Sequence, residues 1–110
     1  YWKLIEINGN PVDSSKMMKE AFIILKKENN RVNGNGGCNG FFGTYELKEG
    51  NRISFSQMGS TMMACLNMEV ESQLLKNLEI VDNYSILNDT LSLNRARMAP
   101  LAKFEAVYLR

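Results

Sequence analysis

The chain has 110 residues, of which 45% are hydrophobic and 23% are charged, a composition typical of an ordinary globular protein. This length is common for one domain, so we expect a single domain over residues 1–110. The 13 basic and 12 acidic residues are mixed along the chain and leave a net charge of +1, which argues against a nucleic-acid partner.

The first half of the chain predicts strands joined by turns. The stretch from Trp2 to Ile7 alternates apolar with polar residues, as a half-buried strand does, and residues 8–11 then have turn chemistry. Further runs rich in β-branched and aromatic residues predict strands over 21–26, 31–34, 41–47 and 52–55. We expect the last two to pair as an antiparallel hairpin around the turn at 49–51.

One helix is predicted, over about 67–79, with Asn67 as a candidate N-cap. Apolar residues recur on one face of this segment and polar residues take the other: Val70, Leu74, Leu75 and Leu78 against Glu69, Glu71, Lys76 and Asn77. The early glutamates also suit the positive end of the helix dipole.

Three more strands complete the predicted fold. Residues 84–87 and 90–93 form a hairpin pattern around Asn88-Asp89, and residues 102–108 give a closing strand. The fold class is therefore α+β and sheet-dominated. We expect a curved antiparallel or mixed sheet that forms a pseudo-barrel, with the helix covering an opening. The order of the strands does not follow from the sequence.

Candidate catalytic chemistry is sparse. The chain has no histidine, which removes the commonest general base and excludes a Ser-His-Asp or Cys-His pair within the chain. Its carboxylates form no paired motif and are expected on the solvated surface: Glu46, Glu49, Glu69, Glu71, Asp82 and Asp89. We therefore expect no enzyme activity, no catalytic residue, no metal and no cofactor.

The seven methionines raise one alternative, a soft-metal site built from thioethers. They include the doublets Met17-Met18 and Met62-Met63. Adjacent residues on a strand point to opposite faces, so a doublet supplies at most one ligand per face. Core filling by these flexible side chains is the favoured interpretation.

The two cysteines, Cys38 and Cys65, lie in distinctive local sequences: Gly36-Gly37-Cys38-Asn39-Gly40 and Thr61-Met62-Met63-Ala64-Cys65. Neither is part of a CxxC redox pair. A disulfide between them would stabilise the fold by about 3.5 kcal/mol on a chain-entropy model, whereas two buried thiols would suit a reducing compartment equally well. We predict that the two cysteines lie close enough to bridge.

These motifs carry a family resemblance that extends over nearly the whole chain. The first motif comprises Trp2, Leu4, Asn8 and Gly9, the second Gly37, Cys38, Asn39, Gly43 and Tyr45, and the third Thr61, Met63, Ala64 and Cys65. Glu71 with Leu78, Leu91 with Leu93, and Leu101 with Phe104 follow in order. In this arrangement the chain resembles the META domain family, also called HslJ-like.

The resemblance implies a mostly β pseudo-barrel with one helix, found in bacterial cell-envelope proteins and lipoproteins and associated with stress responses. We accordingly expect a non-catalytic, monomeric binding or structural module in the periplasm or on the outer cell surface. Its partner would be an envelope protein or a small molecule, and a lipid anchor would lie outside this chain. The alternatives are a thiol-based redox sensor or enzyme that uses Cys38 or Cys65, and the soft-metal module.

The motif residues have two interpretations. The favoured one is that Gly37, Asn39 and Gly43 shape a bend, with Asn39 bonded to local backbone as in an Asx-turn. The other is a surface site that recognises a peptide, glycan or envelope partner. Its candidate residues are Gly37, Asn39, Gly43, Tyr45, Thr61, Met63 and Ala64, beside the cysteine pair.

Overall fold

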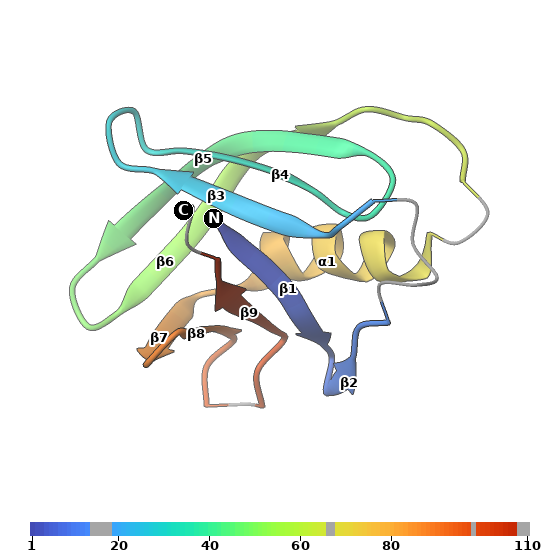
Figure 1. Ribbon diagram of the computed structural model, residues 1–110. Coiled ribbons are helices and arrows are strands. Elements are labelled where there is room, and N and C mark those ends of the chain that lie inside the picture. Colours follow the sequence, from blue (N-terminus) through green and yellow to red (C-terminus); the bar gives the residue numbers. More distant parts are fainter. Residues whose placement is uncertain (14–18, 66–67, 98, 108–110) are drawn as a thin grey trace.

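The computed structural model describes residues 1–13, 19–65, 68–97 and 99–107, which form nine strands and one helix (Figure 1). The strands are β1 (Trp2–Ile7), β2 (Asn10–Pro11), β3 (Phe22–Lys26), β4 (Arg31–Asn35), β5 (Gly40–Lys48), β6 (Arg52–Ser60), β7 (Asn83–Leu87), β8 (Thr90–Asn94) and β9 (Ala102–Ala106). The helix α1 (Glu69–Ile80) follows β6.

The sheet closes on itself. Every pairing is antiparallel, the strand order is β2-β1-β3-β4-β5-β6-β7-β8-β9, and β1 also pairs with β9. Since β2 pairs only with β1, the closed ring is an eight-stranded antiparallel barrel. The predicted sheet-dominated pseudo-barrel with one helix is confirmed, and its sheet is antiparallel and not mixed. The pairing between β6 and β7 is the shortest in the barrel, with one paired position at Arg52 and Asn83.

The core fills the barrel from alternate positions along the strands. Ile23, Leu93 and Phe104 are each 0% exposed, because strand side chains point inward at every second residue. The helix adds Leu74 and Leu78 to this core, at 0% and 1% exposed. The helix packs mainly against β6 and β1 and covers one end of the barrel.

The predicted element bounds hold with three differences. β2 replaces part of the predicted turn at 8–11, and β6 continues from 56 to Ser60, past the polar Ser56 and Gln57. A register shift in the β5–β6 pairing between Phe42 and Thr44, with Gln57 at φ 52°, lets the pairing resume after the irregularity. The helix begins at Glu69; Asn67, the predicted cap, lies outside the described residues.

One prediction about the helix is wrong. Glu71 and Asn77 do not face solvent; they are 3% and 6% exposed. Asn77 donates hydrogen bonds to the carbonyl oxygen of Leu101 at 3.0 Å and to Asn8 Oδ1 at 2.9 Å. The helix is enclosed by loops as well as by the barrel, so part of its polar face is buried and hydrogen-bonded. No helix in the described ranges has the length and apolar character that crossing a bilayer requires.

Candidate functional site

The two cysteines meet at the edge of the barrel beside the start of α1. Cys38 and Cys65 are joined in a disulfide, with Cα atoms 6.5 Å apart, a separation compatible with the predicted bridge. Cys38 is buried at 2% exposed. With both cysteines bonded to each other, neither is a free thiol in this state, and a thiol-based activity would first require reduction of the bridge.

A buried carboxylate holds the loop that carries Cys38. Glu71 Oε1 accepts hydrogen bonds from the backbone N–H of Cys38 at 3.1 Å and of Asn39 at 2.5 Å, and Glu71 Oε2 accepts from Asn39 Nδ2 at 2.7 Å. We call this arrangement the Glu71 clamp. Glu71 is the third residue of α1, where the helix dipole also favours negative charge.

Asn39 extends the clamp to the segment before Cys65. Its Oδ1 accepts from Thr61 Oγ1 at 2.8 Å and from the Met63 N–H at 2.7 Å, and its Nδ2 also donates to the Met63 carbonyl oxygen at 3.1 Å. The bonds of the Asn39 side chain therefore go to two distant segments, α1 and residues 61–63, and the predicted Asx-turn of Asn39 with its local backbone is wrong. This network positions both halves of the disulfide.

The glycines before Cys38 are required by close approach and by backbone conformation. A Cβ atom on Gly36 would lie 2.4 Å from Glu71 Cγ, so any side chain there would displace the clamp. Gly37 has φ 114°, a conformation that L-residues rarely adopt, and its N–H bonds to Asn35 Oδ1 at 2.7 Å. The bend-shaping role predicted for Gly37 matches this geometry.

The remaining predicted site residues separate into three places. Thr61, Met63 and Ala64 lie with Asn39 around an exposed hollow of about 370 Å³ between residues 60–64 and α1. Gly43 packs against β6, where an added Cβ would lie 2.9 Å from the Ser56 carbonyl oxygen. Tyr45 lies elsewhere, in the open end of the barrel.

The methionines beside this hollow do not fill the core. Met62 is 90% exposed and Met63 is 51% exposed, so the core-filling interpretation is wrong for this doublet. Met17 and Met18 lie outside the described residues. No cluster of three or more histidine, cysteine, aspartate or glutamate side chains suited to a metal occurs in the part of the chain that the structure describes. The thioether alternative stays a prediction.

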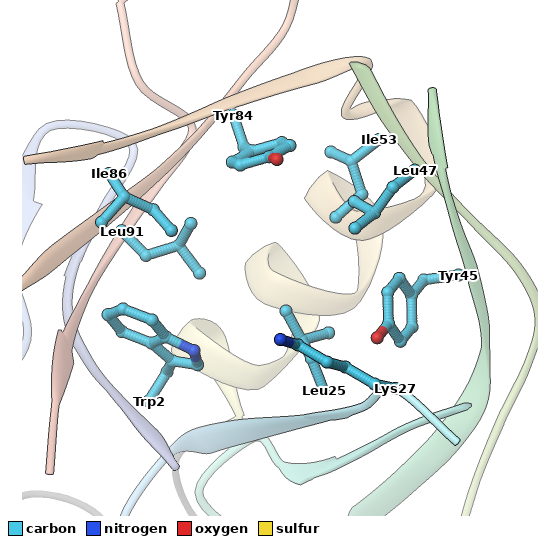
Figure 2. Close-up of a pocket in the computed structure, with 9 residues that line it drawn as sticks. All are labelled: Trp2, Leu25, Lys27, Tyr45, Leu47, Ile53, Tyr84, Ile86 and Leu91. Carbon is cyan, nitrogen blue, oxygen red and sulfur yellow. The ribbon is translucent and has the colours of Figure 1, made fainter. Parts of the chain in front are cut away.

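A cavity lies in the mouth of the barrel, and Figure 2 shows it with α1 behind the lining residues. Its volume is about 390 Å³. The lining comes from six of the barrel strands and the turn after β3: Trp2, Leu25, Lys27, Tyr45, Leu47, Ile53, Tyr84, Ile86 and Leu91. Ile53 and Tyr84 lie next to the single paired position of β6 and β7, Arg52 with Asn83.

The exposure of the lining side chains increases from the floor of this barrel-mouth cavity to its rim. Tyr45, Ile53 and Leu91 are buried, at 5%, 3% and 2% exposed, whereas Leu47 and Ile86 are 54% and 55% exposed. Large apolar side chains that stay exposed around a hollow mark a place where something apolar can bind. Sequence reasoning missed this cavity because its residues are spread from position 2 to position 91 without a motif.

The polar groups of the cavity include a cation and neutral hydrogen-bonding groups. Figure 2 shows the indole nitrogen of Trp2 and the amine of Lys27 facing its centre, with the Tyr45 hydroxyl pointing toward Lys27. No carboxylate is among the described residues that line it. None of these three side chains, nor Tyr84, has a hydrogen-bond or ion-pair partner among the described residues. The cavity therefore presents one positive charge, one indole donor and two hydroxyls that can donate or accept.

Asp82, a carboxylate with a shifted pKa, lies outside the Glu71 clamp and outside the barrel-mouth cavity. The pKa of Asp82 is lowered, first by the hydrogen bond that its Oδ1 accepts from the Ala96 N–H, at 2.8 Å, and then by one from Asn83. The charges of Arg52 and Arg95 act in the same direction. These contacts tie the loop after β8 to the start of β7, which is a structural role.

Comparison with known proteins agrees with this architecture. An NMR structure of a protein from Burkholderia xenovorans is similar, with a TM-score of 0.73 and 24% identity over 97% of this chain and 78% of that one. A second NMR structure gives a TM-score of 0.68 and 21% identity over 94% of this chain and 86% of that one. A search of curated proteins gives no match. The family model of the META domain matches residues 1–108, so the chain belongs to the META domain family.

Proposed function

We propose that this META domain is a non-catalytic binding module of the bacterial cell envelope, which holds an apolar small molecule in the mouth of its barrel. The observation that carries the proposal is the apolar cavity of about 390 Å³, which is within the range of roughly 300–1,000 Å³ common for small-molecule sites. The open ends of small β-barrels are frequent places for such ligands.

The chemistry of the cavity supports binding more than catalysis. Its walls are mainly aliphatic and aromatic, and its polar groups are a lysine, two tyrosines and an indole. A hydrolytic or proton-transfer site usually pairs an acid with a base, and the described lining offers no carboxylate to act as the base. A ligand would instead cover Leu47 and Ile86, whose exposure to water is unfavourable.

The disulfide supports placement in an oxidising compartment, because such bridges persist in the periplasm or at the cell surface. The proposed location, a lipid anchor outside this chain, a monomeric state and a link to envelope stress all belong to this proposal. Thiol alkylation in intact cells would test the compartment. Protection of Cys38 and Cys65 from alkylation is expected, whereas two alkylated thiols in a cytosolic fraction would favour the thiol-based alternative.

The cavity itself is tested with N-phenyl-1-naphthylamine, a neutral apolar dye that accepts energy from excited tryptophan. Trp2 is the single tryptophan of the chain and lines the cavity, so bound dye should quench its emission and fluoresce. Saturable quenching is the expected result. Its absence would reject the proposal.

Two neighbouring residues of β7 provide a matched pair of variants. Ile86 lines the cavity, whereas Leu87 is 75% exposed and does not. Ile86→Glu places a carboxylate at the rim and should weaken dye binding about tenfold, because burying that charge against an apolar ligand is costly. Leu87→Glu adds the same charge outside the cavity and should bind the dye as the parent does. Equal binding by both variants would place the dye elsewhere.

A further inference from the structure

The barrel-mouth cavity contains a positive charge, the Lys27 amine, that has no ion-pair partner among the described residues. The Lys27 amine faces the cavity centre in Figure 2, and among the described residues it has no acidic partner. The other lysines near strands β1 and β9 are paired: Lys3 with Glu20 at 3.5 Å and Lys103 with Glu6 at 3.8 Å.

Each polar group around this amine can donate a hydrogen bond, and none carries a negative charge among the described lining residues. The indole N–H of Trp2 can only donate, and the hydroxyls of Tyr45 and Tyr84 can donate as well as accept. A cationic or purely donating ligand group would meet the lysine charge without an acidic residue to balance it. An anionic group would instead accept charge-assisted hydrogen bonds, which are stronger than neutral ones.

From this arrangement we infer that the ligand is a small amphipathic anion, with a carboxylate held by Lys27 and Trp2 and an apolar chain on the aliphatic floor. The inference rests on the proposed function and names the chemical class of its ligand. The floor that would take the chain is formed by Leu25, Ile53 and Leu91, and Tyr45 stands beside Lys27.

A set of three ten-carbon probes tests the charge, each used below its aggregation concentration and followed by Trp2 fluorescence. Decanoate is anionic, 1-decanol is neutral and decylamine is cationic at pH 7. Decanoate should bind about tenfold more tightly than 1-decanol, the difference expected for one charge-assisted hydrogen bond, and decylamine should bind most weakly.

Adjacent lysines provide the control. Lys27→Met keeps an apolar stem and removes the charge, so it should weaken decanoate binding about tenfold and leave 1-decanol binding within about twofold. Lys26 is exposed on β3 and is not among the cavity residues, so Lys26→Met should leave both probes unaffected.

The outcomes separate the two proposals. Equal binding of decanoate and 1-decanol, with no effect of Lys27→Met, would overturn the anionic class and leave an apolar site. Equal weakening of decanoate binding by Lys26→Met and Lys27→Met would also overturn it, since only general surface charge would then act. No saturable binding of any probe, including the neutral dye, would overturn the proposed function itself.

Discussion

Replacement of Glu71 by alanine should destabilise this domain strongly, although Glu71 is a polar residue of the helix. The Glu71 side chain is 3% exposed and accepts three hydrogen bonds, from the N–H groups of Cys38 and Asn39 and from Asn39 Nδ2. Alanine would leave these buried donors without an acceptor. The cost is the desolvation of the donors and not merely the loss of three contacts.

The magnitude can be worked from these contacts. A hydrogen bond to a charged group contributes about 1.5–3 kcal/mol, and three that share one carboxylate do not add fully. We therefore expect Glu71→Ala to lower the free energy of unfolding by about 4 kcal/mol, a large part of the roughly 5–15 kcal/mol of a typical domain.

Replacement of Glu71 by glutamine tests the bond to Asn39 Nδ2 separately from the two backbone bonds. The amide oxygen of Glu71→Gln can still accept from the two backbone N–H groups, but its NH₂ would face Asn39 Nδ2, another donor. Asn39 cannot turn its amide over, because Oδ1 already accepts from Thr61 Oγ1 and the Met63 N–H. A loss of about 2 kcal/mol is expected from this donor–donor contact.

Urea unfolding with the disulfide intact, followed by far-UV circular dichroism and Trp2 fluorescence, measures both losses. Glu79→Ala is the control, because Glu79 is exposed on the same helix and should change stability by no more than about 0.5 kcal/mol. If Glu71→Ala cost less than about 1 kcal/mol, the carboxylate would not hold the loop and the reasoning from its three bonds would be refuted.

Three further outcomes are expected from the same structure. Gly36→Ala should cost about 2 kcal/mol in urea unfolding, because its Cβ would lie 2.4 Å from Glu71 Cγ, whereas Gly40→Ala, with the nearest atom at 3.7 Å, should be nearly neutral. Replacing both disulfide cysteines with alanine should lower stability by about 3.5 kcal/mol, from the loop entropy of a sequence separation of 27; an unchanged urea midpoint would contradict this. The pKa of Asp82 is lower in the folded state than its ordinary value of 3.8. The ionised carboxylate therefore stabilises the fold fully above pH 3.8, and this stabilisation is lost as the pH falls through the lower pKa of the folded state. The difference in Tm between the parent and Asp82→Asn should therefore shrink as pH falls from 6 to 3, and a constant difference would argue against this contribution.

Local patterns predicted most of the secondary structure. Alternation from Trp2 to Ile7, and the turn residues around 49–51 and 88–89, mark strands that the structure places within one or two residues. Each of these signals acts between neighbours in the chain. β6 was predicted too short because its pairing resumes after an irregularity that the polar Ser56 and Gln57 conceal.

The candidate site could be predicted from the sequence only in part. The cysteine motifs could be located and matched to the META domain family, because Gly36, Gly37 and Cys38 form a compact local signature. The burial of Glu71 could not be found from helical periodicity. A glutamate at the third helical position looks like an ordinary dipole-stabilising residue until the loop from Gly36 to Asn39 is folded over it.

The strand and helix segments, the family and the cysteine motifs could be predicted from the sequence alone. Each of these depends on residues that are close in sequence. The closure of β1 on β9, the clamp on Glu71 and the cavity lined by Trp2, Lys27 and Tyr45 exist only in the folded barrel. They depend on contacts between residues that lie tens of positions apart, and the periodicity of a sequence does not indicate which distant strands will pair.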